Sequence, residues 1–262
     1  MSEELNQLAK GIGKAMETVP ELYRDAFQPA VQETGQLIAR VPRAINAAFS
    51  GIDKWILNKE YSVDETKKLL SQKLKNVDPE KIIEPEPYVA VPAIQAITYS
   101  MNSDELRNLY ANLLAKSMNI DTKELVHPSF VEIIKQLSPL DAQVFKSIME
   151  REVNPCANLR YVKEGGSYRE LMTNVTDFQI APQQLISVSI DNLSKQNLIY
   201  IPSDGHYTLE SVYDPIIKSD FYRNQERMYP PSSDGFYFSI YKKMIEKTNL
   251  GISFYKICIV EF

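Results

Sequence analysis

The sequence predicts a mainly α-helical protein with N-terminal amphipathic helices, a central helical bundle and a C-terminal winged-helix-like α+β domain. Three observations predict this class. Apolar residues recur three or four positions apart over long stretches, which is the spacing of one helix face. Only 9 glycines occur in 262 residues, fewer than an all-β protein with many tight turns requires. Near the C-terminal end, short apolar runs flank a turn sequence. We expect segments at 1–58, 59–137 and 138–262.

The N-terminal segment, 1–58, carries apolar residues at helical spacing between punctuating prolines. One interpretation is an interfacial membrane helix, although such helices usually carry a basic polar face and this segment is nearly balanced in charge. The favoured interpretation is that these helices dock on the rest of the protein or on a second copy and bury their apolar face there. The candidate membrane or partner face consists of Leu5, Leu8, Ile12, Met16, Ile45, Phe49, Ile52 and Trp55.

The central segment, 59–137, contains several helix-start signals. Ser62 with Glu65, and Asn102 with Glu105, have the spacing of capping boxes. Between them, a helix is expected from about residue 88 or 92 to residue 100. Pro128 suits the first position of a further helix. Helices joined by short connections form a bundle, which is the expected architecture of this segment.

The exact residue sequence of this segment is also informative. The runs PEPYVAVPAIQAI, SDELRNLYANLLAKSMN and HPSFVEIIKQLSPLDA, which cover most of 84–142, resemble the abortive-infection alpha family of bacterial phage-defence proteins. The resemblance implies a non-enzymatic defence protein that acts through protein–protein or membrane contacts of its helices. It carries no assigned catalytic residues. A protein partner or self-association is therefore expected, with a membrane surface as an alternative partner.

In the C-terminal segment, 138–262, Ser138, Pro139 and Asp141 predict a helix start. A helix is expected over 168–174 and a longer one from Pro182. The run NLIYIP, the turn SDGH and the run YTLE predict a β-hairpin. This order of helices followed by a hairpin is that of a winged helix, with 211–247 as an insertion rich in tyrosine and phenylalanine.

A winged helix raises the alternative function of a DNA-binding transcriptional regulator. Affinity for DNA requires phosphate contacts from lysine and arginine, whereas the predicted recognition helix carries one lysine against one aspartate. The net charge of −5 also disfavours nucleic acid as a partner. The candidate nucleic-acid or partner contacts are Gln183, Gln184, Ser187, Lys195, Arg223, Arg227, Lys242 and Lys243.

Catalytic and cofactor signals are weak. The chain has no Walker loop, GxGxxG, GxSxG or HExxH sequence, so we expect no enzyme activity, cofactor, metal site or small-molecule substrate. A nuclease-type toxin without a motif is a second alternative. Cys156 and Cys258 are expected to be buried thiols, and His127 is expected to bond the backbone at a helix start. The polar beginning of the chain predicts a cytoplasmic protein, with a peripheral position at the inner membrane as the alternative.

Overall fold

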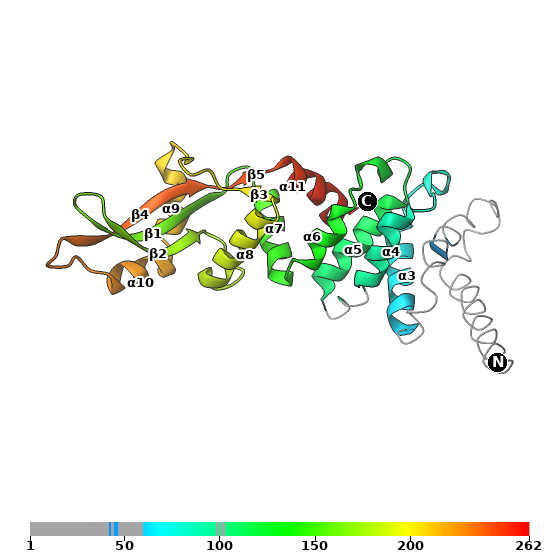
Figure 1. Ribbon diagram of the computed structural model, residues 1–262, viewed down its shortest axis with the longest axis horizontal. Coiled ribbons are helices and arrows are strands. Elements are labelled where there is room, and N and C mark those ends of the chain that lie inside the picture. The colour runs from blue at the N-terminus through cyan, green and yellow to red at the C-terminus, as the bar shows by residue number, and fades with distance from the viewer. Residues whose placement is uncertain (1–41, 43–44, 47–59, 98–99, 101–102, 262) are drawn as a thin grey trace.

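The computed structural model describes residue 42 and residues 45–46, 60–97, 100 and 103–261, with the side chains of 60–64 left aside. This part of the chain has a mixed α/β structure and an elongated shape. Helices make up one end and an antiparallel sheet makes up the other, as Figure 1 shows. Within the described residues, no helix is both long enough and apolar enough to cross a bilayer.

The helical end is built around α5, which contacts α3, α4, α6 and the last turns of the chain. Its elements, in chain order, are α3 (Glu60–Leu74), η3 (Pro79–Lys81), α4 (Pro87–Ile97), α5 (Asp104–Ser117), η4 (Lys123–Leu125), α6 (Ser129–Lys135) and α7 (Pro139–Met149). The polypeptide returns to this bundle at its C-terminal end through α11 (Asn249–Phe254) and a π-helical turn, η6 (Tyr255–Ile259). The predicted helical bundle is therefore present, with a C-terminal segment added to it.

Side-chain caps explain where several of these helices begin. The predicted cap of α7 is confirmed: Ser138 Oγ accepts a hydrogen bond from Asp141 N, and the Asp141 carboxylate accepts one from Ser138 N. The cap of α5 is Ser103 and not Asn102, since Ser103 Oγ accepts from Leu106 N. The predicted cap at Ser62 is wrong, because α3 already begins at Glu60.

One hydrophobic core holds the helical end together and extends past residue 137 into the following elements. It contains Leu70 of α3, Ile94 of α4 and Leu113 of α5, and it continues to Ile190 and Cys258. Within this core, three phenylalanine rings from separate elements meet edge to face. The ring of Phe254 lies 5.4 Å from that of Phe130 and 5.7 Å from that of Phe145.

The sheet end has three antiparallel strands in the order β2–β1–β4, with β1 in the centre. These strands are β1 (Pro155–Lys163), β2 (Tyr168–Val175) and β4 (Phe236–Met244). A hairpin joins β1 to β2, and the chain then forms α8 (Gln183–Lys195) before a short strand β3 (Ile199–Tyr200), which pairs with β5 (Glu246–Lys247). Two irregularities in the β1–β2 register mark β-bulges, one of them next to Asn174, which has a positive φ of 53°.

A second hydrophobic cluster covers one face of this sheet. Leu159 and Val175 of the sheet pack against Tyr213, Ile216 and Tyr222. These last residues belong to η5 (Glu210–Tyr213), α9 (Asp214–Ile217) and α10 (Asp220–Met228). Tyr213 and Tyr222 of the tyrosine- and phenylalanine-rich stretch 211–247 are therefore core residues, while most of the stretch is half-buried or exposed.

Two expectations behind the winged-helix assignment are wrong. Residues 168–174 form strand β2 and not a helix, because they pair antiparallel with β1. The YTLE run forms no returning strand: β3 pairs instead with β5, almost fifty residues further along the chain. The helix expected from Pro182 is confirmed as α8, with Pro182 as its N-cap residue.

Candidate functional site

The face of the sheet opposite the second hydrophobic cluster is the candidate functional surface, and we call it the open face. Side chains at alternate positions of β1 lie on it, and the strand register identifies their neighbours. Val162 is opposite Tyr168 on β2 and Tyr237 on β4. Arg160 is opposite Glu170 and Ser239 in the same way.

Arg160 organises the open face. Its guanidinium carbon lies 4.1 Å from the ring centroid of Tyr168 and 3.8 Å from that of Tyr241, so the cation is held between two aromatic rings. Its Nε also lies 3.3 Å from each carboxylate oxygen of Glu170. Only 17% of the Arg160 side chain is exposed. The arginine therefore fixes the tyrosines in place and contributes little free charge.

Large aromatic surfaces remain accessible around this arginine. Tyr168 is 53% exposed and Tyr237 is 44% exposed. Elements η5, α9 and α10 lie on the other face, through the cluster around Tyr213 and Tyr222. An open face with exposed tyrosines and a fixed arginine has the composition of a protein interface, where Tyr and Arg are enriched.

Helix α8 borders the open face at the β2 edge. The amide nitrogen of Asn174 donates to Asp191 on α8 at 2.7 Å, and its amide oxygen accepts from Lys243 Nζ at 3.4 Å. Leu185 and Val188 lie three residues apart on the same helix, and both are exposed. Helix α8 therefore borders the candidate surface and also carries an exposed apolar pair.

Two of the predicted contacts on α8 have internal partners. Gln183 Oε1 accepts from Thr176 N, and its Nε2 donates to Phe178 O. The buried hydroxyl of Ser187 donates to Thr173 O at 2.9 Å. Gln184 and Lys195 are exposed on the same helix.

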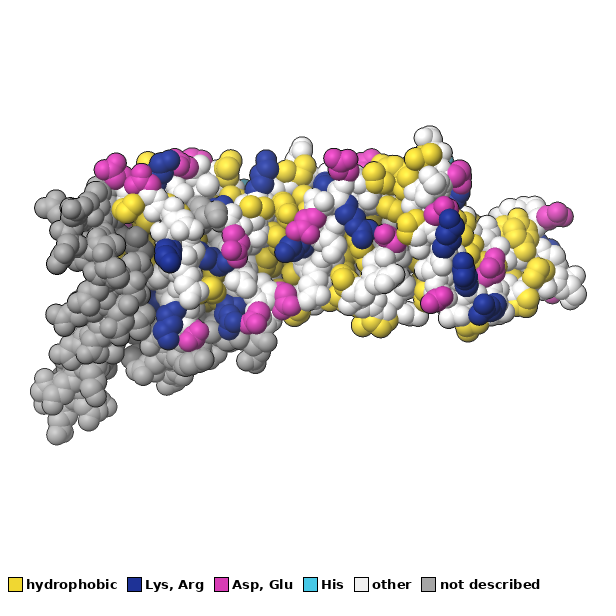
Figure 2. Space-filling view, turned by 180° about the vertical axis from the view of Figure 1, so that it is seen from behind, with side chains coloured by type: hydrophobic (Ala, Val, Ile, Leu, Met, Phe, Trp, Pro, Cys, Tyr) yellow, Lys and Arg dark blue, Asp and Glu magenta, His cyan; other side chains and the backbone are white. Residues whose placement is uncertain are grey.

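The four predicted basic residues of the C-terminal segment do not form one patch. Lys242 and Lys243 are neighbours on β4, so they lie on opposite faces of the sheet. Lys242 forms an ion pair with Glu210 beside the ring of Tyr213, while Arg223 and Arg227 are exposed on α10. Figure 2, which views the molecule from behind, shows several basic side chains in a row toward the sheet end with acidic ones beside them.

Of the predicted N-terminal face, only Ile45 belongs to the described residues. It is 4% exposed and forms part of the main hydrophobic core, which agrees with docking on the protein at this position. Leu5, Leu8, Ile12, Met16, Phe49, Ile52 and Trp55 lie outside the described residues, and their roles stay predictions.

The cysteines and His127 have the structural settings expected of them. Both thiols are free and buried, and burial raises the pKa of Cys156 to about 12 and that of Cys258 well above its ordinary value. His127 Nδ1 accepts a hydrogen bond from Ser129 N at 3.1 Å and contacts Ser129 Oγ, at the start of α6. No group of three or more potential metal-ligating side chains occurs within the described part of the chain.

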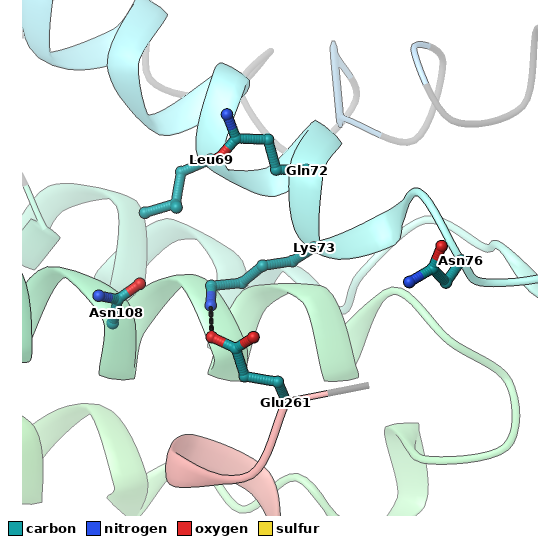
Figure 3. Close-up of a pocket in the computed structure, with 6 residues that line it drawn as sticks. All are labelled: Leu69, Gln72, Lys73, Asn76, Asn108 and Glu261. Atoms are coloured by element: carbon teal, nitrogen blue, oxygen red, sulfur yellow. Dashed lines mark hydrogen bonds and ion pairs between the residues drawn. The ribbon is translucent and has the colours of Figure 1, made fainter.

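A polar pocket of about 260 Å³ lies between α3, α5 and the C-terminal tail. Figure 3 shows Lys73 of α3 bonded to Glu261 of the tail, with Nζ 3.1 Å from Oε1. The Lys73 side chain is 8% exposed and that of Glu261 is 75% exposed, so the tail neutralises a nearly buried cation. The remaining lining residues are Leu69, Gln72, Asn76 and Asn108. In this state the pocket offers hydrogen bonds but no free positive charge from Lys73.

The sequence contained one signal for the open face, in the later strand. Residues 236–241, FYFSIY, are largely aromatic and β-branched types that are enriched in strands, whereas 168–174 shows no period-two alternation. Their pairing through β1 joins segments about seventy residues apart, and no local pattern specifies such a pairing.

Comparison with known proteins supplies the family. The model of the abortive infection alpha family matches residues 58–258, which include every helix and strand from α3 to α11 in full and all of η6 except Ile259. A search of curated proteins and a search of solved structures each returned no significant match. The chain therefore belongs to the abortive infection alpha family, and this membership implies a role in phage defence.

Proposed function

We propose that this protein defends bacteria against phage without catalysis, by binding a protein partner through the open face of its sheet and the adjoining surface of α8. The observation that carries the proposal is the placement of Arg160 against the rings of Tyr168 and Tyr241, with Tyr237 exposed on the same face. Tyrosines held rigid before binding lose little conformational entropy on contact, and such residues supply most of the binding energy in protein interfaces.

The electrostatics favour a protein partner over nucleic acid. Arg160 is neutralised by Glu170, and Lys243 is engaged by Asn174 beside Asp191. A surface with these pairings releases few counterions from a phosphate backbone, so it gains little from the main source of nucleic-acid affinity. The internal hydrogen bonds of Gln183 and Ser187 also reduce the number of side chains on α8 that can contact base edges.

The chemical state of the candidate nucleophiles supports a non-catalytic role. Burial keeps the thiols of Cys156 and Cys258 protonated at neutral pH, and a protonated thiol is a poor nucleophile. The His127 ring nitrogen that bonds Ser129 N is occupied as a helix-start acceptor. These residues therefore fit a function based on contacts between folded surfaces, which needs no activated group, better than they fit a catalytic one.

The test is phage plating on cells that carry the gene, its Tyr168→Ala/Tyr237→Ala variant, or a matched control. Tyr200 provides that control because it is also 53% exposed but belongs to the separate β3–β5 pair. We expect the wild type and Tyr200→Ala to reduce plating of at least one phage in a broad panel, and the double variant to lose this protection. Equal protection by a folded double variant would refute the role of the open face.

A further inference from the structure

The outer edge of β4 has backbone groups that no other strand uses. Ile245 N donates to Asn154 O on the β1 side, which shows that odd-numbered residues here direct their backbone groups toward β1. Backbone direction alternates along a strand, so Phe236, Phe238, Ile240 and Lys242 direct theirs outward. The hydrogen bonds of Phe236 agree, because its N and O both bond to Ser232, outside the sheet.

The edge is covered at Phe236, where Ser232 occupies it, and it is open beyond that residue. Among the described residues, no hydrogen bond reaches the outward N–H and C=O groups of Phe238 or Ile240. An open edge of this kind pairs readily with another strand.

The sequence of β4 is complementary to itself in one antiparallel register. With a two-fold axis at Ser239, Phe238 of each copy lies opposite Ile240 of the other, and each such pair exchanges two N–H···O bonds. On the open face, Tyr237 lies opposite Tyr241. No like charges are opposed. Phe236 comes opposite Lys242 in this register and stays outside the pairing, because its backbone groups already bond to Ser232.

We propose that the chain forms a two-fold dimer in which β4 pairs with β4 of a second copy, antiparallel and centred on Ser239. The three strands of each copy then form one continuous sheet. Residues that meet across the axis are both odd-numbered or both even-numbered. The open faces of the two copies therefore lie on the same side of the joined sheet. The dimer presents a doubled open face to a partner, but its formation requires no partner and no phage component.

The first test uses a cysteine at the axis. In this register Ser239 faces its own counterpart as a non-hydrogen-bonded pair, whose Cα atoms lie about 4.5 Å apart, within the range that a disulfide spans. We expect full-length Ser239→Cys to form a covalent dimer on mild oxidation. Ser167→Cys, in the exposed β1–β2 turn, is the control and should remain largely monomeric. Cys156 and Cys258 are buried and do not compete.

The second test uses charge. Ser239 lies opposite Arg160 within its own chain, so Ser239→Glu is tolerated by the fold, while two such copies oppose like charges across the axis. Light scattering over a concentration series should show dimers for the wild type and a dissociation constant raised about five- to tenfold for Ser239→Glu. Mixing Ser239→Glu with Ser239→Lys should restore dimers.

Circular dichroism and urea melting confirm that each variant is folded before it is compared. A wild type that stays monomeric at every concentration would overturn the proposal. The proposal would also be overturned by a dimer that Ser239→Glu does not weaken and that Ser239→Cys does not crosslink, since the contact in such a dimer would lie elsewhere. These measurements need only purified protein, so a negative result here leaves the plating test of the open face unaffected, and the reverse also holds.

Discussion

Replacing Phe254 with alanine tests whether the C-terminal segment is part of the main core. Phe254 is fully buried, and its ring meets those of Phe130 on α6 and Phe145 on α7. Deleting a buried phenylalanine side chain costs about 3–5 kcal/mol, and each edge-to-face ring pair contributes about 0.5–1.5 kcal/mol of such a loss. We expect Phe254→Ala to lower the free energy of unfolding by about 4 kcal/mol.

The measurement is urea denaturation followed by circular dichroism. The neighbouring Tyr255 is a suitable control, because it is half-buried and its ring lies 6.5 Å from that of Phe145. Tyr255→Ala should lower the unfolding free energy by about 1–2 kcal/mol, since less apolar surface is lost. A loss below about 1 kcal/mol for Phe254→Ala would refute the conclusion that α11 closes the core shared by α6 and α7.

Two further predictions concern a cap and the thiols. Ser138→Ala removes the confirmed capping box of α7 and should lower the free energy of unfolding by about 0.5–2 kcal/mol in the same urea assay. Ser147→Ala, within that helix, should change this free energy little. Equal effects of the two substitutions would contradict the assigned cap. Cys156 and Cys258 should resist alkylation in the folded protein at pH 8 and react in urea. Because the folded pKa of each is raised, their contribution to stability is complete below the ordinary pKa of 9.0 and declines as pH rises above it. Rapid alkylation of both thiols in native buffer would contradict their burial.

The helical end was largely predictable because its determinants are local. The cap at Ser138, the start of α8 after Pro182 and the backbone bond of His127 each depend on residues within four positions of one another. Errors at this end were small shifts: the cap moved from Asn102 to Ser103, and α3 began before Ser62. Neighbouring Asn and Ser are both good caps, so local chemistry could not choose between them.

The sheet end was harder to predict because long-range pairing determines it. Strand β2 resembles a short helix in composition, and its pairing with β1, which also pairs with β4, makes it a strand. Likewise, β3 follows α8 as a hairpin strand would, but its partner β5 comes from the far end of the chain. The open face exists only through this pairing, since Arg160, Tyr168 and Tyr241 come from three strands. No spacing rule connects residues separated in this way.

Site-specific photo-crosslinking at Tyr237 tests the central claim most directly, that this protein acts in defence through protein contact at its open face. A photoreactive phenylalanine at this position, in cells where the gene reduces phage plating, should capture a protein other than a second copy of the chain during infection, identified by mass spectrometry. The same group at Lys218, exposed on α9, should not capture it. Protection without any protein captured at Tyr237, or with the same protein captured equally at Lys218, would contradict the account.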